Sequence, residues 1–396
     1  MPVNASERFC LDVCTRSFLS LWSFGNPQAE RPGAELCDIL VVCEPDVIVF
    51  SVKDCTLTQS GDPVTDLDRW LRRAVLDSVR QVYGAERRLR RMQHVVTLSG
   101  QPGLPLPPKD EMRVHRVAVA LGSEGKVPLV FGDFDKGFVH VFDERSFAIL
   151  LWELDTVPDF LRYLAAKEAF YRSGRTALMA AEEDLLAVYL HGGRAFPEQD
   201  VVVLDPGAWS EFVDRPEYRA RKEEDRLSYA WDGLIEVVAE DVAANNLEFG
   251  TCLAENERVL RAMAREDRFA RRLLGKAYRE FLDKSVANPL ARLCSSPSGV
   301  VYVFLALPRS TDRRERQAEL QGRCWVAKSM YPEAELVVGI GTEQYSPEGF
   351  SLDVALFMPG EWTQEHEQAA RRMQVELGYF RSPIVTHRSE DEWPAT

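Results

Sequence analysis

Two short apolar segments, separated by a single turn, constrain the fold of this 396-residue chain more than any other feature. Residues 39–43 read Ile-Leu-Val-Val-Cys, and residues 46–54 read Asp-Val-Ile-Val-Phe-Ser-Val-Lys-Asp. Runs of this length that are rich in β-branched residues predict two neighbouring buried strands. Strand alternation puts Ser51 and Lys53 on one face and Phe50 on the other. We therefore expect Asp38, which opens the first strand, to face the lysine-bearing end of the second.

The polar residues at this strand pair are of the kinds that hold a metal ion and a phosphate. Carboxylates bind hard divalent cations, and a lysine can orient an attacking water or neutralise charge that develops on a phosphate. Asp38 supplies the carboxylate and Lys53 the ammonium group. Glu35, Asp54 and Glu7 are further candidates to supply an oxygen ligand. The pattern predicts a site for phosphodiester hydrolysis that depends on Mg²⁺ or Mn²⁺.

An acid followed, after a gap, by a residue-x-Lys triplet resembles the signature of the restriction-endonuclease-like superfamily, often written PD-(D/E)XK. Asp38 would be the first acid and Lys53 the lysine, and the resemblance covers the N-terminal region only. Ser51 departs from the signature, because that family usually has Glu, Asp or Gln there. The resemblance implies that Glu7 is the acid often placed on the helix before the first strand. The catalytic candidates are Asp38, Lys53, Ser51 and Glu35, and the metal-ligand candidates are Asp38, Glu7 and Glu35.

A long basic helix is predicted directly after the second strand, over residues 66–91. Apolar or small residues recur there at intervals of three and four, which is the buried stripe of a helix, and the other faces carry eight arginines. The planar fork of arginine makes paired hydrogen bonds to phosphate, although a solvated face that offsets nearby acids would look the same. The resemblance implies that this helix brings a polar group such as Gln81 towards the site. The nucleic-acid-binding candidates are Arg72, Arg73, Arg80, Gln81, Arg87 and Arg88.

Charge and composition exclude several other classes of protein. The formal net charge of −14 argues against a general nucleic-acid coat protein, because phosphate binding is driven by basic surface, but a locally basic cleft remains compatible with it. No apolar run approaches the length of a membrane span and the first apolar segment contains charged residues, so we expect a soluble, cytoplasmic protein without a membrane partner. The eight cysteines and six histidines show no CxxC, HExxH or His-x-His spacing. They predict neither a zinc site nor a catalytic histidine.

The order of elements predicts an α/β protein in three parts. Residues 1–155 are expected to form a restriction-endonuclease-like mixed sheet with flanking helices. Residues 156–294 are expected to be mainly helical, and residues 295–396 to form a small α/β domain of order strand, helix, strand, strand, helix. The first part is expected to contain added strands at 113–121, 138–142 and 147–153.

The helical middle part contains two features with a structural interpretation. Asp232 and Glu236 lie among aromatic residues and are expected to be solvent-facing or capping groups. Arginines recur among acids over residues 258–272. That pattern predicts an exposed, salt-bridged helix face of modest energetic value.

Two functions from different classes remain open. The first is a metal-dependent nuclease that acts on DNA or, less favoured, on RNA, for which the family resemblance implies a bacterial role in attacking foreign DNA. The second is a nuclease-like domain that no longer cuts and serves as a binding or regulatory module, with protein partners in a larger assembly. Ser51 separates the two, because a neighbouring carboxylate must replace the missing one if the site is to hold a metal.

Overall fold

The computed structural model describes residues 4–30, 33–58, 60, 62–125, 127, 129–178, 181–204, 206–244, 253–346, 349, 351–358, 361–381 and 390–394. Helices and mixed sheets make the protein an α/β protein, as the sequence predicts. The chain divides into two compact units between Arg219 and Ala220, here called unit 1 and unit 2. The three-part division at 155/156 and 294/295 stays a prediction. Within the described ranges, no helix is both long and apolar enough to cross a lipid bilayer.

Unit 1 is built on a six-stranded mixed sheet of order β1-β2-β3-β6-β8-β7. The strands are β1 (Ser23–Gly25), β2 (Ile39–Cys43), β3 (Asp46–Asp54), β6 (Arg113–Leu121), β7 (Gly132–Asp133) and β8 (Phe138–Phe142). Neighbours are antiparallel from β1 to β3 and parallel from β3 through β6 to β8. β2 is buried along its whole length and β3 along most of it, which explains why both read as continuous apolar runs.

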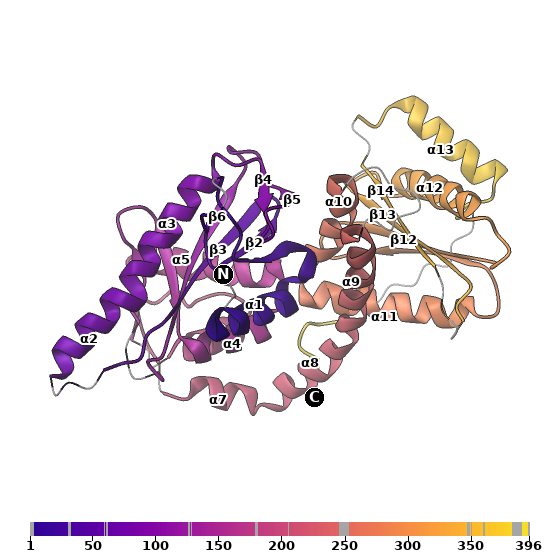
Figure 1. The fold of residues 1–396 in the computed structure, drawn as a ribbon. Coiled ribbons are helices and arrows are strands. Elements are labelled where there is room, and N and C mark those ends of the chain that lie inside the picture. Colours follow the sequence, from indigo (N-terminus) through magenta and orange to yellow (C-terminus); the bar gives the residue numbers. More distant parts are fainter. Residues whose placement is uncertain are drawn as a thin grey trace. The chain divides into compact units, whose positions relative to one another are not determined.

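Helices cover both faces of this sheet (Figure 1). The helices on one face are α2 (Pro63–Leu71), the π-helical turn η2 (Arg72–Leu76) and α3 (Asp77–Leu89), and those on the other are α1 (Ala5–Phe18), α4 (Glu144–Glu153) and α5 (Val157–Arg172). On the first face, Val79 and Val82 share a core with Val49. On the second, Phe50 contacts Phe147 at 6.0 Å between ring centroids. The helix predicted over 66–91 is confirmed, with η2 as an irregularity inside it.

The strand predicted at 147–153 is wrong, because these residues belong to α4. A capping box begins this helix: the Asp143 carboxylate accepts from the Ser146 N–H, and the Ser146 hydroxyl accepts from the Asp143 N–H. This local signal outweighs the apolar run that suggested a strand. The remaining elements of unit 1 are η1 (Ser20–Trp22), β4 (His94–Val96), β5 (Pro102–Pro105), β9 (Thr176–Leu178), α6 (Glu182–His191), β10 (Val201–Val203) and α7 (Ala208–Val213).

Unit 2 contains a four-stranded sheet of order β11-β12-β13-β14 in which only β12 and β13 are parallel. Its elements are η3 (Arg226–Ser228), α9 (Tyr229–Ala243), α10 (Leu253–Ala264), α11 (Arg268–Ser285), β11 (Leu290–Ser295), β12 (Val301–Leu307), α12 (Arg313–Met330), β13 (Val337–Glu343), β14 (Leu352–Phe357) and α13 (Gln364–Glu376). Helix α8 (Pro216–Asp225) begins just before the unit boundary. The sheet packs on α12 through Leu320 and on α9 and α11 through Trp231 and Phe281.

Two expectations about the helices of unit 2 are wrong in part, one for Asp232 on α9 and one for the arginines of α11. Asp232 is buried instead of solvent-facing, and its two oxygens accept from Arg268 and Arg271, each at 2.7 Å. Arg272 is also buried. Arg268, Arg271 and Arg272 therefore form internal ion pairs, since a buried charge requires a partner. Arg258 is exposed, as the sequence predicts.

Candidate active site

Asp38 and Ser51 face each other across the β2–β3 pair. Ile39 pairs with Phe50 in this antiparallel register, so the next pair outward is Asp38 with Ser51. Residues directly opposite in such a pair point to the same face, which here is the face covered by α3. Both side chains are buried, at 5% and 1% exposure. Lys53 lies two residues further along the same face, close enough for its charge to act on the Asp38 carboxylate.

The Asp38 carboxylate is held by the neighbouring strand and by a second acid. Its Oδ2 accepts a hydrogen bond from the Val52 N–H at 2.5 Å, and its side chain is hydrogen-bonded to that of Glu35. Burial and, to a smaller extent, Glu35 raise the pKa of Asp38, while the Val52 N–H and the charge of Lys53 lower it, and the net result is a pKa of about 6. Asp38 therefore changes its charge just below neutral pH.

Asn26 connects two of the candidate acids. Its Nδ2 donates to Glu7 Oε2 at 3.2 Å and to Glu35 Oε1 at 3.1 Å, and its backbone N–H donates to the Asp38 carbonyl at 2.8 Å. The residue adopts a positive φ of 44°, which asparagine tolerates better than most residues. The sequence gives a turn signal here, Gly-Asn-Pro, but nothing that marks Asn26 as a partner of both acids.

Helix α3 closes the site from the other side. The Ser51 hydroxyl donates to Gln81 Oε1 at 2.5 Å, and Arg88 Nη1 donates to the Glu35 carbonyl at 3.0 Å. A pocket of about 420 Å³ lies between the strand end and the helix. It is lined by Glu35, Leu36, Cys37, Asp38, Arg80, Gln81, Gly84, Ala85, Arg87 and Arg88.

Some of the candidate residues line this pocket and others do not. Two predicted acids, Glu35 and Asp38, share it with four of the six predicted nucleic-acid-binding residues. Arg72 and Arg73 lie on η2 and are not among the lining residues, and Arg72 is paired with Asp68 at the surface. Glu7 is not among the lining residues, but Asn26 donates both to Glu7 and to Glu35, which is.

The oxygen atoms near the pocket are potential ligands for a divalent cation. Among the residues that the structure describes, no group of three or more His, Cys, Asp or Glu side chains is placed to hold a metal ion. Mg²⁺, however, is commonly bound by one or two carboxylates together with substrate phosphate oxygens, and Asp38 and Glu35 open to the same pocket. Asn26 Oδ1 is in addition a buried oxygen without a hydrogen-bond partner in the described part of the chain. Asp38 and Glu35 are thus the two carboxylates that line this pocket, and a cation held there would need an anionic substrate to complete its coordination.

The raised pKa of Asp38 predicts how stability depends on pH. Because the pKa of about 6 lies above the ordinary value of 3.8, ionising Asp38 destabilises the folded state progressively between pH 4 and 6 and by a constant amount above. Asp38→Asn removes that ionisation. The free energy of unfolding of Asp38→Asn relative to wild type should therefore rise by about 1–3 kcal/mol from pH 4 to pH 7. Urea unfolding across this range measures it, and a difference that does not change with pH would contradict the prediction.

Comparisons of the chain with protein-family models, with curated proteins and with solved structures found no match.

Proposed function

We propose that unit 1 is a metal-dependent nuclease domain that binds and hydrolyses a nucleic-acid phosphodiester, with DNA as the expected substrate. The observation that carries this proposal is the pocket between β2 and α3. It places two acidic side chains, Asp38 and Glu35, opposite three arginines in one cavity. Phosphate-ester chemistry uses both kinds of group together, since arginines neutralise the phosphate and acids hold its counter-cation.

Each group has a role that follows from its position. Asp38 and Glu35 would hold Mg²⁺ or Mn²⁺, which when bound supplies Lewis-acid polarisation of the phosphate and a more acidic water. Lys53, on the same face as Asp38, stabilises negative charge that develops on the phosphate oxygens. Arg80, Arg87 and Arg88 bind the flanking phosphates, and their density explains how an acidic protein attracts a polyanion locally.

The order of the elements also supports the resemblance to restriction-endonuclease-like nucleases. A helix precedes the strands, the lysine stands on β3, and the basic helix follows directly and packs on the same face. Gln81 of that helix reaches Ser51, which occupies the place where the family usually has an acid or Gln. In this proposal, the amide of Gln81 lies where the missing side chain would point.

A second candidate function rests on the same contact. The Ser51 hydroxyl donates to the Gln81 carbonyl oxygen, and one Asp38 oxygen is engaged by the Val52 N–H. A site whose oxygen atoms are already satisfied by the protein is suited to binding nucleic acid without cutting it. In this reading, unit 1 is a regulatory or binding module within a larger assembly.

Cleavage assays separate the two functions. Purified protein should cut duplex DNA, single-stranded DNA or RNA in Mg²⁺ or Mn²⁺, and EDTA should abolish the cut. Nucleic-acid binding without cleavage of any of the three substrates in either metal would favour the binding module.

The pocket arginines should dominate nucleic-acid affinity. Replacing Arg80, Arg87 and Arg88 together by glutamate should weaken binding steeply and reduce the slope of log affinity against log salt by about 3, because each phosphate contact contributes close to one unit. Fluorescence anisotropy with labelled DNA over a range of salt concentrations measures both quantities. The matched control is glutamate at Arg69, Arg72 and Arg73, which changes the charge equally on the same helical run but outside the pocket. Equal losses in the two variants would remove the pocket from the interface.

A further inference from the structure

Four consecutive residues near the C-terminus, 390–393, contact two helices of unit 2. They read Glu-Asp-Glu-Trp. Their contacts come from Arg221 on α8 and from Arg272 and Lys276 on α11, and Asp225 on α8 accepts from Arg272. We call these four helix residues the basic groove and residues 390–393 the tail segment. On each helix the two residues are four positions apart, so they lie on one face.

The basic groove contacts both the side chains and the backbone of the tail segment. Arg221 Nη1 donates to Glu392 Oε1 at 3.2 Å, and its guanidinium lies 4.5 Å from the centre of the Trp393 ring. Lys276 Nζ donates to Glu390 Oε1 at 2.9 Å. Carboxylate and indole are thus recognised by charge-assisted hydrogen bonds and a cation–π contact.

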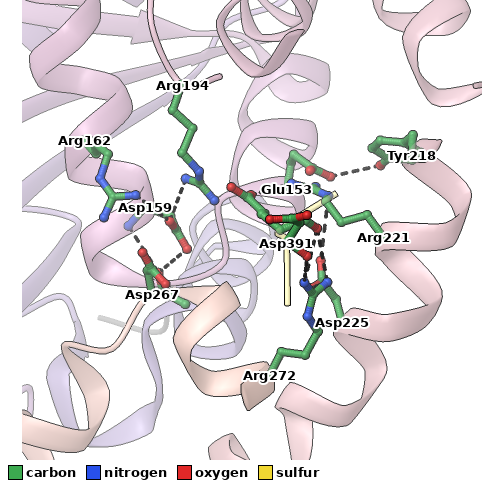
Figure 2. Close-up of polar contacts among 12 residues, drawn as sticks. Glu153, Asp159, Arg162, Arg194, Tyr218, Arg221, Asp225, Asp267, Arg272 and Asp391 are labelled. Carbon is green, nitrogen blue, oxygen red and sulfur yellow. Dashed lines mark hydrogen bonds and ion pairs between the residues drawn. The ribbon is translucent and has the colours of Figure 1, made fainter. Parts of the chain in front are cut away.

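Arg272 contacts the tail backbone. Its Nη2 donates to the Asp391 carbonyl at 2.8 Å and to the Glu392 carbonyl at 3.2 Å, while Nη1 donates to Asp225 Oδ1 at 3.2 Å. Figure 2 shows the Arg272 guanidinium directed at Asp225 and at the tail around Asp391. Because this guanidinium is buried at 1% exposure, withdrawal of the tail would remove two of its acceptors. A buried donor that lacks an acceptor costs free energy. The groove is therefore stabilised by an extended segment whose carbonyl groups accept from Arg272.

We propose that the basic groove is a binding site for an acidic, tryptophan-containing peptide and that residues 390–393 of the same chain are its resident ligand. Charge contacts and one aromatic contact dominate the interaction, so added salt weakens it and a peptide supplied in trans competes with it. The tail is tethered to the groove, which gives it an effective concentration near the millimolar range. A free peptide therefore binds measurably only when the resident tail is weakened.

The test uses the full chain and a fluorescent peptide with the sequence of residues 389–396. Glu390→Gln, Glu392→Gln and Trp393→Ala are introduced together, which weakens the tail in cis without shortening the chain. This variant should bind the peptide at least ~10-fold more tightly than wild type by fluorescence anisotropy, and raising the salt concentration should weaken that binding. A peptide that carries the same three substitutions is the matched control and should bind neither protein.

Further variants and outcomes decide the proposal. Two further substitutions, Lys276→Gln and Arg221→Ala, are each added to the tail variant, and each should lower its affinity for the peptide. The Lys276 side chain is about one-third exposed, so its substitution should leave the fold intact. The control with the substituted peptide remains valid even if Arg221→Ala does not fold. Failure of the folded tail variant to bind the peptide would overturn the proposal. Equal affinity of the peptide for wild type and for the tail variant would also overturn it. So would light scattering that shows a wild-type dimer which the tail substitutions dissociate, since the ligand would then be the tail of a second copy.

Discussion

Replacing Asp38 by asparagine is expected to lower the rate of nucleic-acid cleavage by roughly 10² to 10⁴ while the protein stays folded. Asparagine keeps the size of the side chain and an oxygen that can accept from the Val52 N–H. What it removes is the negative charge that, in the proposed function, would hold the cation beside the phosphate. Lys53→Ala should have a loss of similar size, because it removes the positive charge on the same face. Cleavage rates of labelled duplex DNA in saturating Mg²⁺, with circular dichroism to verify folding, measure both effects.

The matched control for this experiment is Asp46→Asn. Asp46 is another buried acid of the same sheet, but it opens β3, far from the Ser51 end that Asp38 faces, and it pairs with His115 at 2.9 Å. Its substitution should leave cleavage close to wild type. If Asp38→Asn cuts as fast as Asp46→Asn, Asp38 has no part in catalysis. Ser51→Glu adds a carboxylate opposite Asp38 and should tighten Mg²⁺ binding in calorimetry if the proposed function is right.

The second large effect is expected at an ion pair inside unit 1. Lys167 and Glu182 are almost fully inaccessible, and Lys167 Nζ donates to both Glu182 oxygens, at 2.7 and 2.6 Å. The Tyr163 hydroxyl donates to the same carboxylate at 2.7 Å. Lys167→Met should lower the free energy of unfolding by about 3–5 kcal/mol, because it leaves a buried carboxylate without its cation. Urea unfolding followed by circular dichroism measures the loss.

A double variant distinguishes loss of charge balance from loss of packing. Adding Glu182→Gln to Lys167→Met removes the orphaned charge but keeps an acceptor for Tyr163, so most of the stability should return. The surface pair of Arg72 with Asp68 provides the comparison, since both side chains are more than half exposed. Asp68→Asn should change the free energy of unfolding by less than about 0.5 kcal/mol. A double variant as unstable as Lys167→Met alone would show that the ion pair is not the source of the loss.

The parts of the fold that could be predicted from the sequence are those with local signals. Strands β2 and β3 are apolar runs with turn residues between them, and the alternation along β3 already indicates that Ser51 and Lys53 share a face. The basic helix is marked by its buried stripe. Residues 147–153 of α4 read as a strand because a short apolar run has no clear period, and only the Asp143–Ser146 capping pair marks the start of a helix.

Contacts between distant residues could not be predicted in the same way. Asp232 is separated from Arg268 by 36 residues and from Arg271 by 39, and no local pattern distinguishes an arginine that will be buried from one on a solvated face. The same holds for Asn26, whose role depends on two acids that approach it only after the sheet forms. The groove and its tail segment lie more than a hundred residues apart in sequence, since Arg272 and Asp391 are separated by 119 positions.

The position of Gln81 at the site depends on the π-helical turn η2, an irregularity several residues earlier in the same helical run. Such a turn is equivalent to one extra residue inserted into an α-helix, and it lies between Trp70, which is buried on α2, and the buried residues of α3. If the same residues formed a regular α-helix without this turn, everything that follows would be rotated by about 100° relative to α2. Either the apolar stripe of α2 or that of α3 would then leave the sheet, and Gln81 would turn away from Ser51. The π geometry of this short turn is thus required for the pocket, although none of its side chains is among the lining residues.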